Sequence, residues 1–416
     1  MDRRALLSSL LLPLASPARP GQAQISVSTR PTGFFFRDGD RVVLIGDSIT
    51  EQLLHTNYVE TYVRSRFPRW QLAFRNVGIG GDTSTGGNRR TERDILSFEP
   101  TAVTITFGMN DGGYRAVDPA RLAAYERGLQ GIVEQLKPRG IRVAILSSSP
   151  VEERANGPVL AGYNLTLERF AAAAQQVAER NGTVFVDQFH PHAAALQRAR
   201  AVDPALRING GDAVHPGPAG QYLMAWAILK GLGAPPRISS AEVDAPTRTV
   251  REAENCAVHT VRANGGGIRF LRAEEAIPLH LPPAARPILA WAPIQEELNS
   301  YRLRVTGLEP RNYDLRVDGE RCGTFRGPEL AAGVNLAPVT EGPIARQAQA
   351  VFDAVVAKNR YYHQQIFRGV VLNNQVPAAE KAAQIRQREV ELPKLEAAIR
   401  EALVLRPHLF ELIPAA

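Results

Sequence analysis

Short apolar runs alternate with longer amphipathic segments between Arg41 and about Pro235. The short runs are apolar or β-branched, as is typical of strands buried on both faces of a parallel sheet. They predict five strands, at Arg41–Ile45, Gln71–Val77, Ala102–Phe107, Arg142–Ser147 and Val184–Asp187. Apolar residues at helical spacing predict five helices, at Glu51–Phe67, Thr91–Ser97, Pro119–Lys137, Gly162–Arg180 and Pro218–Leu232. This alternation predicts a parallel sheet with helices on both faces, whose ligands bind beyond the carboxyl ends of the strands.

The pattern changes after a linker at Gly233–Ser240. The segments "SYRLRVTGL" and "NYDLRVDGERCGTF" predict a small antiparallel module, with Asp318-Gly319 as a hairpin turn. From Pro343 the pattern is helical, which indicates helices packed on the core or on a partner. The sequence thus predicts an α/β domain over residues 24–235, a β-rich module over 236–342 and a helical region over 343–416.

The first 23 residues have the layout of a secretory signal peptide. Arg3 and Arg4 form a basic start, an apolar run follows from Ala5 to Ala15, and small residues lie near Ala23. The run is too short to span a bilayer comfortably, and no later stretch is apolar enough to do so. We therefore expect a secreted or periplasmic protein with no membrane span.

The formal net charge of +7 raises the question of an anionic partner. Arginine carries nearly all of the positive charge and is spread along the chain without a dense run. No predicted helix presents a basic stripe interleaved with aromatic residues, so the sequence predicts no nucleic-acid partner.

Two cysteines, Cys256 and Cys322, occur in the chain. In an oxidising compartment they could form one disulfide, and the alternative is two unpaired buried thiols. Spacing alone does not show whether their Cα atoms lie within bonding range, so both alternatives stay open.

Four loops carry residues suited to nucleophilic catalysis. They are "GDSIT" with Ser48, "NVGIGGDTS" with Gly80 and Gly81, "GMND" with Asn110, and "GGDAVHPGPAG" with Asp212 and His215. Each loop alone would be an ordinary turn. Together they supply what a hydrolytic serine needs: a base, a carboxylate three residues away to orient it, and donors for an oxyanion.

The four blocks resemble the SGNH subgroup of the GDSL hydrolases, named for Ser, Gly, Asn and His. The resemblance spans Gly46–Pro216 and implies a flavodoxin-like, three-layer α/β/α sandwich with five parallel strands. It implies a serine esterase without a metal or organic cofactor, in which Ser48 attacks the ester, His215 takes the proton and Asp212 stabilises the imidazolium. The implied oxyanion hole consists of the backbone N–H groups of Ser48 and Gly81, with Gly80 as the alternative, and the Asn110 side chain.

The natural substrate is less well defined than the chemistry. Our first hypothesis is a secreted carbohydrate O-acetylesterase acting on a small-molecule or polysaccharide ester. The alternative is a lipid or aryl esterase of broad specificity, similar to lysophospholipases or thioesterases. A third hypothesis is a carbohydrate-binding protein that keeps the fold without turnover, but the intact Ser48, Asp212 and His215 argue against it. The sequence does not define the oligomeric state.

Several neighbouring residues have less specific roles. Asp47 is expected to support the hydrogen bonds of its loop. His190 and His192, in "HPH", are the only close histidine pair, and no ligand-spaced acid or cysteine cluster accompanies them. They follow the fifth strand and could border the cleft, as could Tyr114 and the loop Pro150–Pro158.

Overall fold

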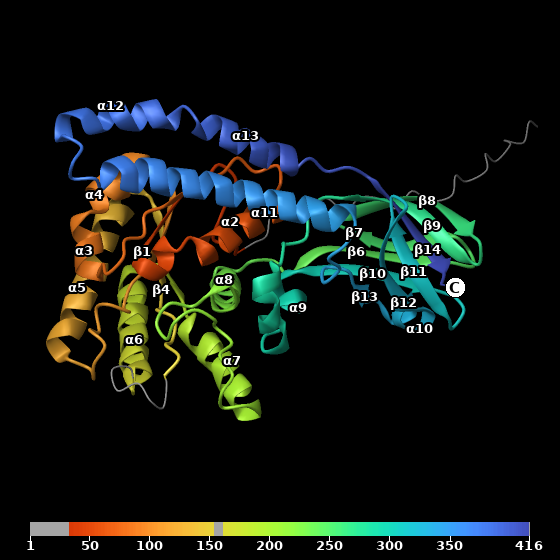
Figure 1. The fold of residues 1–416 in the computed structure, drawn as a ribbon, viewed down its shortest axis with the longest axis horizontal. Coiled ribbons are helices and arrows are strands. Elements are labelled where there is room, and N and C mark those ends of the chain that lie inside the picture. The colour runs from red at the N-terminus through yellow and green to blue at the C-terminus, as the bar shows by residue number, and fades with distance from the viewer. Residues whose placement is uncertain (1–32, 154–160, 416) are drawn as a thin grey trace, which may run out of the picture.

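A five-stranded parallel sheet forms the centre of the N-terminal half of the protein (Figure 1). The computed structural model describes residues 33–153 and 161–415, so the predicted signal segment lies outside the described residues. The strand order is β2-β1-β3-β4-β5. The bounds are β1 Arg41–Gly46, β2 Ala73–Asn76, β3 Ala102–Thr106, β4 Arg142–Leu146 and β5 Val184–Val186. The prediction of five parallel strands in a flavodoxin-like order is confirmed.

Helices cover both faces of this sheet. Their bounds are α1 Ser48–Glu51, α2 Leu54–Arg66, α3 Ser84–Arg89, α4 Thr91–Asp94, α5 Pro119–Leu136, α6 Tyr163–Asn181, α7 Phe189–Val202 and α8 Pro218–Gly231. Val42 and Leu44 of β1 point to the core under α2 and α8, whereas Val43 and Ile45 point to the core under α5 and α6. This alternation along one buried strand gives the three layers.

The predicted helices differ from the observed ones in two respects. The helix expected at Glu51–Phe67 is interrupted, because Leu53 adopts a left-handed backbone conformation with φ of 65°. Helices α3 and α7 were not predicted, since α3 is short and contains two glycines and α7 begins with the "FHPH" segment. Helix α3 packs against α5, and α7 packs against α8.

The β module consists of two packed sheets. Their strands are β6 Arg237–Asp244, β7 Thr249–Glu254, β8 Cys256–Asn264, β9 Gly267–Glu274, β10 Ser300–Thr306, β11 Asn312–Val317, β12 Glu320–Arg326, β13 Val334–Asn335 and β14 His408–Pro414. The orders are β13-β10-β6-β7 and β12-β11-β14-β9-β8. Asp318 and Gly319 have φ of 52° and 83° and join β11 to β12, as predicted for the hairpin. The module is not wholly antiparallel, because β6 and β10 pair in parallel.

The C-terminal region is helical only as far as Ala402. Its helices are α11 Pro343–Tyr361, the π-helical segment Tyr362–Val371, α12 Ala378–Glu389 and α13 Leu392–Ala402. The last strand, β14, then lies between β11 and β9 in the β module. The expectation of helix to the chain's end is therefore wrong for this strand. Its buried Phe410 and Leu412 flank the less buried Glu411, which is the two-residue period of a strand.

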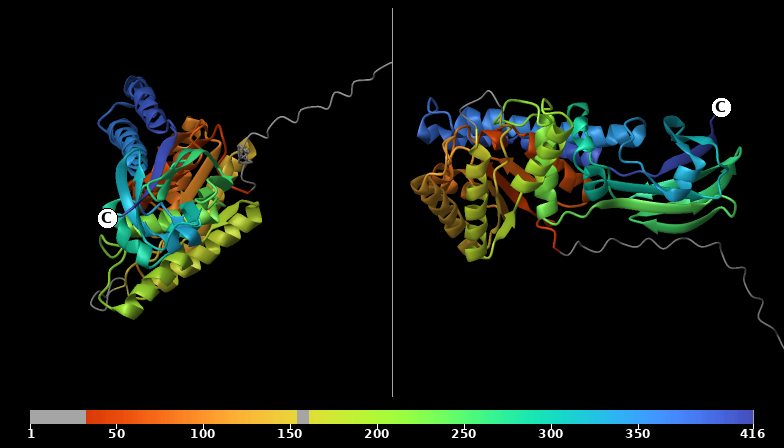
Figure 2. Two further views of the ribbon diagram at one scale, coloured as in Figure 1. Left: turned by 90° about the vertical axis from the view of Figure 1, so that its right-hand side faces the viewer. Right: turned by 90° about the horizontal axis from the view of Figure 1, so that it is seen from below.

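Figures 1 and 2 show the α/β domain and the β module lying end to end, with α11 running across both. On the α/β side, Phe352 of α11 stacks on Tyr58 of α2 with ring centroids 5.6 Å apart. Further along α11, the fully buried Lys358 binds the fully buried Glu60, which also accepts a 2.7 Å bond from Arg64. Burial would raise the pKa of Glu60, but the charges of Lys358 and Arg64 outweigh it and hold that pKa below its usual value.

Cys256 and Cys322 are both free and buried. Their thiols approach the carbonyl oxygens of Ser240 and Glu320, each at 3.4 Å. Of the two alternatives open from the sequence, the structure shows two unpaired thiols. In the described parts of the chain, no helix combines the length and apolar character needed to cross a bilayer.

We expect Lys358→Met to lower the free energy of unfolding by about 3 kcal/mol, because it leaves part of the buried Glu60 charge uncompensated. Urea unfolding at pH 7, followed by circular dichroism, measures this loss. The matched control is Lys394→Met, which removes an exposed lysine paired with Glu391 and should leave the unfolding midpoint unchanged. Equal losses of unfolding free energy in the two variants would show that the buried Lys358–Glu60 pair stabilises the fold no more than an exposed pair does.

Candidate active site

The structure brings together the three residues predicted to form a triad. Ser48 is the first residue of α1, two residues after β1 ends, and its Oγ is 2.8 Å from Nε2 of His215. The opposite ring nitrogen, Nδ1 of His215, is 2.9 Å from Oδ2 of Asp212. This geometry lets the carboxylate fix the tautomer, so that Nε2 can accept the serine proton.

The loop that carries His215 is folded tightly around Asp212. Oδ1 of Asp212 accepts hydrogen bonds from the backbone N–H groups of Val214, at 2.7 Å, and His215, at 2.6 Å. Burial acts against ionisation of this carboxyl, but the two amides and the imidazole outweigh it and hold the pKa of Asp212 below its usual value. Gly211 closes the loop at φ of 74°, where a Cβ would lie only 2.3 Å from the carbonyl oxygen of His215.

Glu152, from the segment after β4, binds the loop that carries His215. Its backbone N–H donates to the carbonyl of Ala213 at 2.9 Å, and its buried carboxylate accepts from the N–H of Asn209 at 2.8 Å. Sequence reasoning had singled out the loop Pro150–Pro158 only as a cleft wall. Residues 154–160 of that loop lie outside the described residues.

The two candidate glycines after β2 have different partners. The N–H of Gly80 donates to Oε2 of Glu51 at 2.5 Å. In the described part of the chain no acceptor is recorded for the N–H of Gly81, whose φ is 74°. Because the Gly80 amide is already engaged, the geometry favours Gly81 as the backbone donor, as the resemblance implies.

Asn110 is held in one orientation by two neighbours. Its Nδ2 donates one hydrogen to the carbonyl of Asp82 at 2.9 Å, and its Oδ1 accepts from the Tyr114 hydroxyl at 2.9 Å. These two contacts fix the plane of the Asn110 amide and so the direction in which its second Nδ2 hydrogen can donate. Tyr114 has an unusual φ of 57° and packs its ring against Tyr163, with centroids 5.3 Å apart. Tyr114 is thus part of the support of Asn110, a role that the sequence had not indicated.

Two buried acids hold the loops that carry these residues. Asp111 accepts from the backbone N–H of Ser84 at 2.9 Å and from that of Gly108 at 3.0 Å, so it joins the loops after β2 and β3. Asp47 accepts from the N–H of Ile49 at 3.0 Å and caps α1. Burial, reinforced by the nearby Asp111, raises the pKa of Asp47 to about 7. Asp47 therefore supports its loop, as expected.

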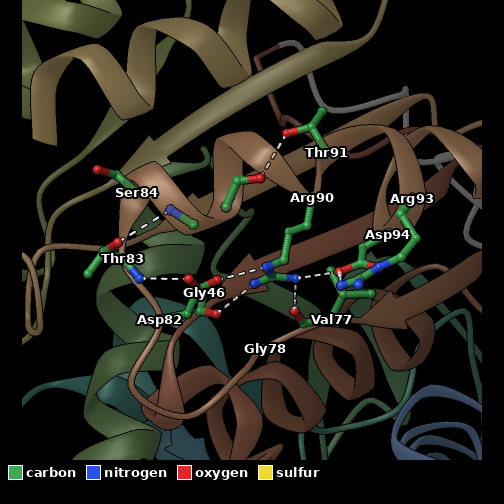
Figure 3. Close-up of polar contacts among 12 residues, drawn as sticks. Gly46, Val77, Gly78, Asp82, Thr83, Ser84, Arg90, Thr91, Arg93 and Asp94 are labelled. Atoms are coloured by element: carbon green, nitrogen blue, oxygen red, sulfur yellow. Dashed lines mark hydrogen bonds and ion pairs between the residues drawn. The ribbon is translucent and has the colours of Figure 1, made fainter. Parts of the chain in front are cut away.

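Arg90 joins the ends of two strands to the loop that carries Gly81 (Figure 3). The buried guanidinium donates to the carbonyl oxygens of Val77, at 2.7 Å, and Gly46, at 3.2 Å. It also pairs with the Asp82 carboxylate at 2.7 Å. The backbone carbonyl of Asp82 in turn accepts the hydrogen bond from Nδ2 of Asn110. Sequence reasoning missed Arg90, because nothing in the pattern distinguishes it from the many other arginines.

The pair His190 and His192 lies outside this site. His192 is buried, its Nε2 is 2.5 Å from Oδ1 of Asn209, and burial lowers its pKa to about 4. His190 is exposed and lies 2.7 Å from Asp187 and 3.2 Å from Glu168. Among the described residues, no group of three or more histidine, cysteine or acidic side chains is arranged to hold a metal ion.

An open hollow of about 520 Å³ lies in front of the serine. It is lined by Ser48, Glu51, Gln52, Gly211, Asp212, His215 and Gly217. All of these described residues are polar or glycine. The site therefore offers a bound molecule several hydrogen-bonding groups, and none of these lining residues has an aliphatic side chain.

Comparisons with known proteins identify proteins that are similar to this chain. A curated relative, the acetylxylan esterase of Geobacillus stearothermophilus, is 27% identical over 217 residues, covering 47% of this chain and 94% of that protein. The uncharacterized lipoprotein YqeF of Bacillus subtilis strain 168 is 28% identical over 87 residues, 20% of this chain and 36% of that protein. The solved structure of a gut microbial diltiazem-metabolizing enzyme superposes with a TM-score of 0.80 at 26% identity, covering 91% of this chain and 98% of the other.

The sequence profile of one family covers the segment that carries all four blocks. Residues 44–223 match the GDSL-like lipase/acylhydrolase family, and this span runs from β1 into α8. Residues 44–223 therefore form a domain that matches the GDSL-like lipase/acylhydrolase family, and the comparisons support an ester-hydrolysing enzyme.

Proposed function

We propose that this protein is an exported serine esterase that removes acetyl groups from carbohydrates. The observation that carries the proposal is the unbroken series of contacts from Asp212 through His215 to Ser48, with distances of 2.9 and 2.8 Å, beside the polar hollow. The acetylxylan esterase relative supports the choice of acetyl group and carbohydrate.

The reaction follows from the positions of these groups. Ser48 Oγ attacks the ester carbonyl carbon while Nε2 of His215 takes its proton, and Asp212 stabilises the imidazolium. The N–H groups of Ser48 and Gly81 and the Asn110 amide stabilise the oxyanion. Collapse of the tetrahedral intermediate breaks the bond to the sugar oxygen, which takes the proton from His215 and leaves as a hydroxyl. A water molecule then gives a proton to His215 and attacks the acyl carbon. The acid leaves, and the Ser48 oxygen takes the proton back from His215.

The polar lining of the hollow favours a short acyl group. Burying a methylene group against apolar side chains stabilises binding by about 0.8 kcal/mol. A long acyl chain in the hollow would find no aliphatic side chain among the residues that line it, so it would gain less of this energy than in an apolar pocket. The same polar groups suit the hydroxyls of a sugar.

One observation favours a second candidate, an esterase of broad specificity that accepts aryl or lipid esters. The solved structure that covers 91% of this chain is named for metabolizing diltiazem and not for a polysaccharide. The two candidates share the serine chemistry and differ only in the alcohol and acyl groups that they accept.

We expect the purified protein to hydrolyse p-nitrophenyl acetate and to release acetate from acetylated xylan. Ser48→Ala should lower kcat by a factor on the order of 10⁴ or more, because it removes the nucleophile. Rates on p-nitrophenyl esters of increasing chain length test the acyl preference. Absence of Ser48-dependent hydrolysis on every ester would refute the esterase proposal, and preference for long chains would favour the second candidate.

We expect Asn110→Ala to lower kcat for p-nitrophenyl acetate by about 10²- to 10³-fold with little change in KM, because the lost donor acts mainly in the transition state. Tyr114→Phe, which keeps the ring but removes the hydroxyl that orients Asn110, should cause a smaller fall in kcat. If Asn110→Ala kept kcat within twofold of the wild-type value, Asn110 would not belong to the oxyanion hole.

Export is proposed from the basic start and apolar run of residues 1–23. Full-length protein expressed in a bacterium with a periplasm should be recovered there with its N-terminus near residue 24. Intact-mass measurement of that fraction gives the cleavage site. Recovery of the uncleaved chain from the cytoplasm alone would contradict export.

A further inference from the structure

A carboxylate next to the nucleophile is held from the far end of the chain. Glu51 is the last residue of α1, which begins at Ser48, and its side chain lines the hollow. Oε2 of Glu51 accepts the 2.5 Å hydrogen bond from the N–H of Gly80. Oε1 pairs with the guanidinium of Arg368, from the π-helical segment Tyr362–Val371. A contact thus links the C-terminal region to the oxyanion loop.

The segment that carries Arg368 is firmly anchored on the α/β domain. Phe367 is fully buried in the same core as Val77, the residue that follows β2. The guanidinium of Arg75 lies over the ring of Tyr362, 4.5 Å from its centroid. π-helical turns are rare and often occur at functional sites. In this protein the π-helical segment places Arg368 beside Glu51, and half of the Arg368 side chain is exposed.

A side chain at residue 80 would displace the Glu51 carboxylate. A Cβ on Gly80 would lie 2.9 Å from Oε2 of Glu51 and 3.9 Å from Cβ of Ser48. The carboxylate therefore fixes the Ile79–Gly80 peptide plane, which directly precedes the peptide that carries the Gly81 N–H. It also places a negative charge near the position where the oxyanion develops, and such a charge opposes the reaction unless a cation compensates it.

We propose that Arg368 is a positioning residue for the oxyanion hole. Arg368 holds the Glu51 carboxylate against the Gly80 amide, so that the Gly81 amide is presented to the substrate, and it compensates the Glu51 charge beside Ser48. His363, whose Nε2 lies 3.9 Å from the same carboxylate, faces Glu51 from the same segment. This inference rests on the proposed esterase function, and it makes the C-terminal region part of the catalytic unit.

The test is a kinetic comparison of Arg368→Met with Arg368→Lys on p-nitrophenyl acetate. Arg368→Met should lower kcat about tenfold and change KM less than twofold, because substrate contacts are retained while the oxyanion loop and its charge balance are altered. Arg368→Lys keeps the positive charge and should restore most of kcat. Adding Glu51→Gln to Arg368→Met removes the uncompensated charge and should recover part of kcat.

The matched control is Arg346→Met. Arg346 is also an exposed arginine of the C-terminal region and pairs with Glu320, far from the active site. It should leave kcat, KM and the unfolding midpoint unchanged. Amide hydrogen exchange, measured on peptides that contain Gly80, adds a reading that does not depend on activity. Exchange there should accelerate in Arg368→Met and not in Arg346→Met.

The outcomes separate the two proposals. Wild-type kcat in Arg368→Met, or a loss of kcat that follows a lowered unfolding midpoint and is not restored by lysine, overturns the positioning role. If the wild-type protein lacks Ser48-dependent hydrolysis, the esterase proposal fails. The exchange measurement alone then tests whether Arg368 holds Glu51 against the Gly80 amide. Accelerated exchange at Gly80 in Arg368→Met supports this positioning contact, and unchanged exchange overturns it.

Discussion

The 2.8 Å contact between Ser48 and His215 joins two loops that are 167 residues apart in the sequence, and most of the domain serves to hold it. Ser48 is placed by β1, which the strand order puts between β2 and β3, and His215 is placed by the loop before α8. Gln221 in the first turns of α8 accepts from the N–H of His55 in α2 at 3.0 Å and donates to the carbonyl of Pro216 at 3.2 Å. The two loops are thus fixed to a shared frame, which matters because small misplacements of catalytic groups cost large factors in rate.

The loops at the carboxyl edge need polar partners that regular structure does not give them. Beyond β2, Arg90 donates to the backbone carbonyl of Val77, and it also donates to that of Gly46 at the end of β1, which the N–H of Ile79 reaches as well. Asp111 does the reverse for the backbone amides of Ser84 and Gly108. Burying these charges has a desolvation cost, which the multiple hydrogen bonds reduce. For Asp111 burial still outweighs the hydrogen bonds and raises the pKa above its usual value.

The sequence predicted what depends on local patterns. The five strands and the placing of Ser48, Asn110 and His215 beside strand ends or the last helix followed from apolar runs, and the Asp212–His215 contact followed from a spacing of three. Contacts between distant side chains left no such mark. Arg90 and Tyr114 act through partners brought together only by the fold, and Glu51 meets Arg368 across most of the chain. β14 did carry a two-residue period, but it is a short run after two long helices, whose pattern concealed it.

The C-terminal region unites the α/β domain and the β module. The chain leaves the module after β13, returns along α11 to α2, where Lys358 meets Glu60, and then passes beside the active site at Arg368. Two further helices bring it back to the module, where β14 fills the centre of a five-stranded sheet. Both parts depend on the C-terminal region. Without it the α/β domain would lose Lys358, which pairs with the buried Glu60, and the β module would lose its central strand β14. The single superposition over 91% of the chain fits this view, since a loosely attached module would not be expected to keep its place in a relative only 26% identical.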